Sequence, residues 1–226
     1  MGVERLPRYR MLYSKDGPAR FISHLDLVRT FERVIRRADI PAAFSMGFNP
    51  HLIFSFAAPL QVGIGGESEY LDILLKNEVP PEELYASIGS VLSEGICLKG
   101  IWQAPDDSPA LMSVVEWAEY KVKVGLEEQL SAGALEGYID SFLKQPEIIV
   151  GRKAKKGRVK SIDIRPGIYD LGGFIKDNTL ILQMKLKTGS NGSVRPGETL
   201  DAFLEHNSLA VRPVEIDIVR TGVFLR

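Results

Sequence analysis

A run of basic side chains is the densest group of chemistry-bearing residues in the sequence. Between residues 152 and 165 the chain has seven Lys or Arg residues against one Asp, a local net charge of +6 in a protein of formal net charge −1. The seven are Arg152, Lys153, Lys155, Lys156, Arg158, Lys160 and Arg165. Clustered cations suit a phosphate backbone, and such binding weakens as salt rises. The run indicates an anion or RNA contact, with Arg165 as a candidate for a bidentate contact, or else a solvated basic loop.

A second basic feature precedes it along the chain. Arg29, Arg33 and Arg36 recur at helical spacing, on the side opposite Leu27, Phe31, Val34, Ile35 and Ala38, and Arg37 adjoins them. These four arginines are candidate RNA contacts that assist the basic run. Tyr9, Tyr13 and Phe48 are candidate stacking groups for bases, with core packing as the alternative for each.

A short turn, GFNPH, has a composition that sets its backbone geometry. Gly47 permits positive φ, Asn49 tolerates left-handed geometry and Pro50 fixes φ, while Phe48 and His51 are the side chains it presents. Two interpretations remain open. The turn is either a structural connection or a surface that contacts a ligand, an RNA base or a partner.

Histidine is scarce, with three in the chain. His24 and His51 are weak candidates for a general acid or base in a metal-independent ribonuclease. The sequence alone does not bring the two together, so the catalytic residues stay unassigned.

Motifs for bound cofactors and metals are not found in the sequence. The chain has one cysteine, Cys97, expected to be a small buried apolar residue, and no metal-ligand spacing. Gly63-Ile64-Gly65-Gly66 is followed by Glu67 and Glu69, whose charges disfavour a phosphate. We therefore expect no metal and no cofactor.

The apolar periodicity predicts the elements that position these residues. In the first half, strands are expected at 8–13, 52–57, 70–76 and 96–102, and helices after Ser23 and after Pro80-Pro81. In the second half, strands are expected at 114–124, 147–150, 179–187 and around 214–218, and helices around 130–142 and after Arg195. Each half reads as strand, helix, strand, strand, helix, strand, with the basic run interrupting the strand that starts at Glu147.

This order predicts the fold class and the domains. The expected fold is α+β, with two tandem ferredoxin-like (βαββαβ) units that have antiparallel sheets. The expected boundaries are residues 1–105 for the first unit, 106–112 for a linker rich in Pro, Asp and Ser, and 113–226 for the second unit with a basic hairpin insertion.

Composition places the chain among ordinary globular proteins, with 45% apolar and 25% charged residues. No run of about 18 apolar residues occurs and the N-terminus lacks a signal-peptide pattern, so we expect no membrane partner and a cytoplasmic location.

Three sequence stretches resemble a bacterial family, the radical-SAM-linked domain of unknown function. They are RRADIPAAFSMGFNPH (36–51), IFSFAAPLQVG (53–63) and EYLD (69–72), and the Lys153–Lys156 run with DIRP (163–166) is similar to its second signature. The resemblance implies a domain that occurs alone or fused behind a B12-binding radical-SAM enzyme. It supplies no activity and no catalytic residue.

Three hypotheses follow. The first is an RNA-binding accessory module, without catalysis of its own, that presents tRNA or rRNA to a separate radical-SAM modification enzyme. The second is a metal-independent ribonuclease of tandem ferredoxin-like type. The third is a protein-binding adaptor of a radical-SAM enzyme with no RNA contact.

Overall fold

The computed structural model describes residues 6–105, 107–153, 157–190 and 192–226. The chain forms an α+β structure with few helices and a large, mostly antiparallel sheet. It divides into two compact units: unit 1 is Met1–Val115 together with Gly222–Arg226, and unit 2 is Glu116–Thr221. Unit 2 thus begins at Glu116, beyond the expected 113. The last five residues of the chain belong to unit 1.

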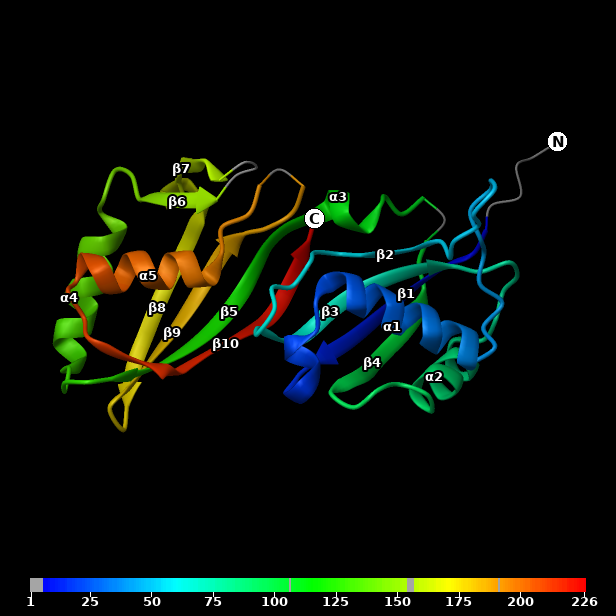
Figure 1. Ribbon diagram of the computed structural model, residues 1–226, viewed down its shortest axis with the longest axis horizontal. Helices are drawn as coiled ribbons and strands as arrows, with labels where there is room; N and C mark the ends of the chain where they lie inside the picture. Colours follow the sequence, from blue (N-terminus) through cyan, green and yellow to red (C-terminus); the bar gives the residue numbers. More distant parts are fainter. Residues whose placement is uncertain (1–5, 106, 154–156, 191) are drawn as a thin grey trace. The chain divides into compact units, whose positions relative to one another are not determined.

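Unit 1 is built on strands β1 to β4. Its elements are β1 (Arg8–Lys15), η1 (Gly17–Phe21), α1 (His24–Arg37), β2 (Phe54–Phe56), β3 (Gly65–Leu74), α2 (Pro81–Gly89), β4 (Ile96–Gln103) and α3 (Leu111–Val114). β1 pairs with β3 and β4, and β3 also pairs with β2, all antiparallel. Ile73 of β3 faces Tyr9 on one side and Phe54 on the other. The spatial order is therefore β4-β1-β3-β2 (Figure 1).

Alternation along β1 explains the core of unit 1. Tyr9, Met11 and Tyr13 are buried, and the residues between them are half-buried. The apolar stripe of α1 packs against them, with the Phe31 ring edge-on to Tyr13 at 5.0 Å. The helix begins where expected, because the Ser23 hydroxyl accepts a hydrogen bond from the Asp26 amide. Tyr9 and Tyr13 are therefore core residues.

Unit 2 repeats the same order with one insertion. Its elements are β5 (Val115–Leu126), α4 (Ala132–Leu143), β6 (Ile149–Lys153), β7 (Val159–Asp163), η3 (Arg165–Gly167), β8 (Ile168–Lys176), β9 (Thr179–Lys187), α5 (Pro196–His206) and β10 (Val211–Leu225). The strand order is β10-β5-β9-β8, and β6 and β7 form a separate two-stranded sheet. Helices α4 and α5 lie on one face of the strands, and Phe142 packs edge-on to Phe203 (Figure 1).

Strand β8 differs from the expectation for the second half. The strand expected at 147–150 is instead the start of the small hairpin, and Ile168–Lys176 takes its place beside β9. The alternation along β8 is broken between Ile168 and Asp170, where the register shifts, and by Gly172-Gly173. A side chain at Gly173 would lie 2.7 Å from the Ile181 carbonyl oxygen, so the close approach of β9 requires glycine there.

The end of the chain completes a small apolar cluster in unit 1. Val223 is buried with Ala57, Ala58 and Leu111, and the Arg226 amide donates to the Val114 carbonyl. Residues far apart in sequence therefore contribute to one cluster.

The expected burial of Cys97 is wrong. It points outward from β4, between the buried Ile96 and Leu98, so its thiol is exposed. None of the helices in the described ranges combines the length and the apolar character that crossing a bilayer requires.

Candidate nucleic-acid interface

The basic run forms the hairpin β6–β7 in unit 2. Arg152 faces Lys160 across the hairpin, and Lys153 faces Val159. Val150 and Ile162, which form another facing pair two residues from Arg152 and Lys160, pack against the core. Because facing residues share one side of a strand pair, Arg152 is directed to the side that meets the rest of the unit.

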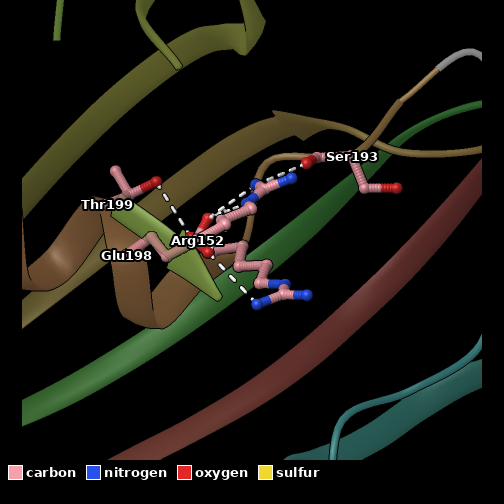
Figure 2. Close-up of polar contacts among 5 residues, drawn as sticks. Arg152, Ser193, Glu198 and Thr199 are labelled. Atoms are coloured by element: carbon pink, nitrogen blue, oxygen red, sulfur yellow. Dashed lines mark hydrogen bonds and ion pairs between the residues drawn. The ribbon is translucent and has the colours of Figure 1, made fainter. Parts of the chain in front are cut away.

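Arg152 is the residue that fastens the hairpin to the unit. Its Nε lies 2.8 and 3.0 Å from the two carboxylate oxygens of Glu198, and its Nη2 lies 2.6 Å from Oε2. Nη2 also donates to the Ser193 carbonyl at 2.8 Å (Figure 2). The bidentate pair is mostly shielded, with side-chain exposures of 19% and 17%. Arg152 was expected to hold phosphate, but in this geometry its fork is engaged by the start of α5.

Glu198 also forms an ion pair with a second arginine. Arg195 Nη1 lies 3.2 Å from Oε1, and its own side chain is half exposed. Partial desolvation and then the charge of Glu198 raise the pKa of Asp201, one turn further along α5. The start of α5 thus holds one carboxylate between two guanidinium groups.

Arg165 and Asp163 fix the base of the hairpin. Arg165 donates from Nε to the Leu143 carbonyl at 3.0 Å and from Nη1 to the Ile168 carbonyl at 3.1 Å. Asp163 Oδ1 accepts the amides of Ile148 and Arg165. Arg165 therefore joins the end of α4 to the start of β8, and its fork is used within the unit rather than presented to a ligand.

Three basic side chains of the hairpin remain exposed: Lys153, Arg158 and Lys160. Within the described residues none of them forms an ion pair. Lys155 and Lys156 lie outside the described residues. The exposed basic side chains are therefore fewer than the seven residues of the run. They lie on a strand pair that the Arg152–Glu198 ion pair fastens to α5.

A hollow of about 290 Å³ lies beside the hairpin. Arg152, Lys187 and Ser193 line it together with Asp163. Sequence reasoning missed Lys187, Arg195 and Glu198, which approach the run only through folding. The one available signal was the Gly- and Ser-rich composition of 189–193, which predicts a loop before the helix that contains Glu198.

The arginine stripe of α1 lies in unit 1. Arg29, Arg33, Arg36 and Arg37 are all exposed, as the helical spacing predicts. Arg29 pairs with Asp26 at 3.2 Å, which accounts for part of its charge. The stripe belongs to unit 1 and the hairpin to unit 2.

The turn Gly47–His51 closes a tight loop in unit 1. The Ser45 amide donates to the His51 carbonyl at 2.8 Å, and the Ser45 hydroxyl lies 3.1 Å from the His51 amide and 2.8 Å from its Nδ1. Gly47 has φ of +130°, which favours glycine. The loop leaves Met46 and Phe48 fully exposed.

The two candidate catalytic histidines occupy different environments. His24 is half-buried and edge-on to Phe56 at 5.2 Å, and burial followed by the Lys15 charge lowers its pKa. His51 is exposed and bonded to Ser45. No hydrogen bond or ring contact found in the described residues joins the two imidazoles. The described residues also contain no group of three or more His, Cys, Asp or Glu arranged to hold a metal.

Comparison with known families assigns the chain to one of them. It belongs to a family described as an uncharacterized protein conserved in bacteria (DUF2344), which matches residues 8–196. A search of curated proteins gives no match.

Two solved structures are similar to the chain. One is a chain of the "Crystal Structure of a Cbf5-Nop10-Gar1 Complex", with a TM-score of 0.51 and 11% identity, covering 97% of this chain and 49% of that one. This protein thus spans about half the length of that neighbour, and the likeness concerns the α+β fold alone. The other is an unknown protein from Galdieria sulphuraria, with a TM-score of 0.27 and 13% identity, covering 96% and 99% of the two chains.

Proposed function

We propose that the protein is an RNA-binding accessory module that presents RNA to a separate radical-SAM modification enzyme in the cytoplasm. The observation that carries the proposal is the exposure of Lys153, Arg158 and Lys160 on one hairpin that Arg152 fastens to α5. The radical-SAM partner rests on the sequence resemblance at residues 36–72 and 153–166. The RNA partner rests on the charge and its presentation.

We infer that each unit is a ferredoxin-like βαββαβ domain. The order of elements in each unit supports this, as do the strand orders β4-β1-β3-β2 and β10-β5-β9-β8, with the β6–β7 hairpin inserted between α4 and β8. In both units the last and first strands are neighbours and the third lies beside the first. In this arrangement the helices cover one face of each sheet. The loops that connect the elements are left for binding.

The basic hairpin acts through the phosphate backbone. Lysine supplies mobile point charges, whereas Arg158 supplies a planar fork for two phosphate oxygens. The overall charge of −1 does not oppose this binding, because a partner at the hairpin meets a local field that is strongly positive. The clamp of Arg152 on Glu198 holds the strand pair in place, so Lys153 on one side and Arg158 and Lys160 on the other are carried on a fixed support.

The test is RNA binding as a function of salt. Purified protein is titrated into fluorescent bulk tRNA and rRNA fragments between about 50 and 200 mM salt, for the wild type and for a triple variant with Lys153→Ala, Arg158→Ala and Lys160→Ala. Each lost phosphate contact lowers the slope of log affinity against log salt by about 0.7 to 0.9. We expect a slope smaller by about 2 and an affinity at least about tenfold weaker in the triple variant.

The control removes the same number of positive charges elsewhere. Lys99, Lys123 and Lys176 are exposed and lie outside the hairpin. Their triple alanine variant is expected to bind RNA like the wild type. If both triple variants keep the wild-type affinity and slope, the hairpin is a solvated basic loop and the proposal fails.

A further inference from the structure

We propose that the loop Ser45–His51 of unit 1 is a docking knob that inserts into an apolar pocket of a partner protein. At the loop tip Met46 is 98% exposed and Phe48 is 105% exposed, so both side chains stand entirely in water. Met46 and Phe48 are only two residues apart, and apolar side chains exposed together rather than singly mark interaction sites. Of the other aromatic rings near this loop, Phe44 at the stem is 39% exposed and Phe56 is buried in the core.

The loop is organised before any partner arrives. Phe44 and Leu52 pair across the stem, and the next residues inward, Ser45 and His51, are joined through backbone and side chain. Gly47 takes a φ that other residues rarely adopt. A loop fixed in this way loses little further conformational freedom on binding, which favours a short knob as an anchor.

The charges around the loop favour a protein as its occupant. Residues 40–66 contain no Lys, Arg, Asp or Glu, and His51 is their only ionisable side chain. Proteins bind RNA and anionic membranes through Lys and Arg side chains. In contrast, the centres of protein interfaces are enriched in Phe and Met and depleted in Lys, Glu and Asp.

Lys76 places a positive charge on one side of this surface. Its Nζ lies 5.7 Å from the centre of the Phe44 ring, at the stem rather than the tip. The matching site is therefore a pocket that accepts a phenyl ring and a thioether, with an acidic group on its rim opposite Lys76. A knob of this kind supplies an anchor within a larger interface.

This inference deepens the proposed function, on which it rests, by naming the surface that would hold the enzyme. The knob lies in unit 1 and the basic hairpin in unit 2. A variant of one surface leaves the other intact. Loss of RNA binding and loss of docking can thus be observed separately.

The experiment places a photo-crosslinker at the knob in living cells. Phe48 is replaced by p-benzoylphenylalanine, which keeps the ring, and the protein is irradiated in a bacterium that has the natural chain. The crosslinked protein is identified and purified, and its affinity for the wild-type chain is measured by titration. We expect one ribonuclease-resistant crosslink, and we expect Phe48→Ala to weaken the purified complex by about tenfold or more.

Matched variants separate the knob from general apolarity and from RNA. Phe21 is a 69% exposed phenylalanine in the same unit, and Phe21→Ala is expected to keep the affinity. The Lys153, Arg158 and Lys160 triple alanine variant is expected to keep the crosslink. A thermal melt confirms that Phe48→Ala is folded, which its exposure favours.

Several outcomes overturn the inference. A crosslink to RNA shows that Phe48 stacks on a base, a crosslink to lipid shows a membrane contact, and a crosslink to a second copy of this chain shows self-association. No crosslink, or a purified complex whose affinity Phe48→Ala does not change, shows that the knob is not an anchor.

Discussion

The basic hairpin and the apolar knob are two exposed features built on opposite principles. The hairpin carries Lys153, Arg158 and Lys160 on a strand pair that an ion pair fastens to a helix. The knob carries Met46 and Phe48 on a loop closed by hydrogen bonds around Ser45, in a stretch almost free of charge. The difference shows how one chain can offer a long-range electrostatic surface and a short-range apolar one.

The largest expected effect comes from breaking the clamp of the hairpin. Glu198→Gln leaves Arg152 mostly shielded without its carboxylate, and Arg195 loses the same partner. Removing one member of a buried pair costs about 3–5 kcal/mol, so a partly exposed pair should cost about 2 kcal/mol. Urea unfolding measures the loss, and hydrogen exchange should show faster amides in Ile149–Lys153 and Val159–Asp163.

The control for the clamp is Glu205→Gln. Glu205 is an exposed carboxylate on the same helix, so this change should leave both measurements near the wild type. Hairpin amides that exchange at the wild-type rate in Glu198→Gln would mean that the strands hold themselves.

The knob is tested by a pair of glycine substitutions expected to have opposite signs. Gly47→Ala places a side chain on a residue with φ of +130°, and this strain should lower the free energy of unfolding by about 1–2 kcal/mol. Gly137→Ala lies in α4 with open space around it, and alanine there should raise stability by about 0.5–1 kcal/mol. Equal effects of the two changes would contradict a conformationally fixed knob.

The smallest expected effect concerns the acidic end of the hairpin clamp. Because the folded state raises the pKa of Asp201, its contribution to stability is present below the ordinary value of 3.8 and is lost as pH rises through the folded pKa. Asp201→Asn should therefore raise the melting temperature slightly near pH 7. The gain should shrink toward pH 3.

The Glu198 charge is one cause of this shift, so it offers a second check. In a Glu198→Gln background, the gain from Asp201→Asn near pH 7 should be smaller than in the wild type. A melting temperature that Asp201→Asn lowers at neutral pH would contradict the sign of the shift.

Local patterns in the sequence predicted the elements whose residues alternate cleanly. The strand Thr179–Lys187 has the bounds that its buried Leu180, Leu182, Met184 and Leu186 indicate, and the first helix begins after Ser23 as its cap predicts. Strand β8 was missed because two glycines and a register shift remove its alternation. Sequence periodicity reports local burial, so an element that depends on close packing against a neighbour carries little of it.

The candidate site was predicted in part for the same reason. The charge of the basic run is evident from nearly consecutive residues in the sequence. The role of Arg152 in fastening the hairpin depends on Glu198, which lies 46 residues further on. Arg165 likewise donates a hydrogen bond to the Leu143 carbonyl, a contact that the spacing of residues in the sequence does not predict. Phe48 is exposed at the tip of a loop that the hydrogen bonds of Ser45 with His51 close, and these contacts are not evident from the sequence.

The return of residues 222–226 to unit 1 has a consequence for dividing the protein into fragments. Val223 packs with Ala57 and Leu111, so a fragment that stops at Val115 lacks one member of this cluster. Strand β10 serves both units, because Thr221 ends unit 2 and Gly222 belongs to unit 1. A cut at one peptide bond therefore cannot release both units whole.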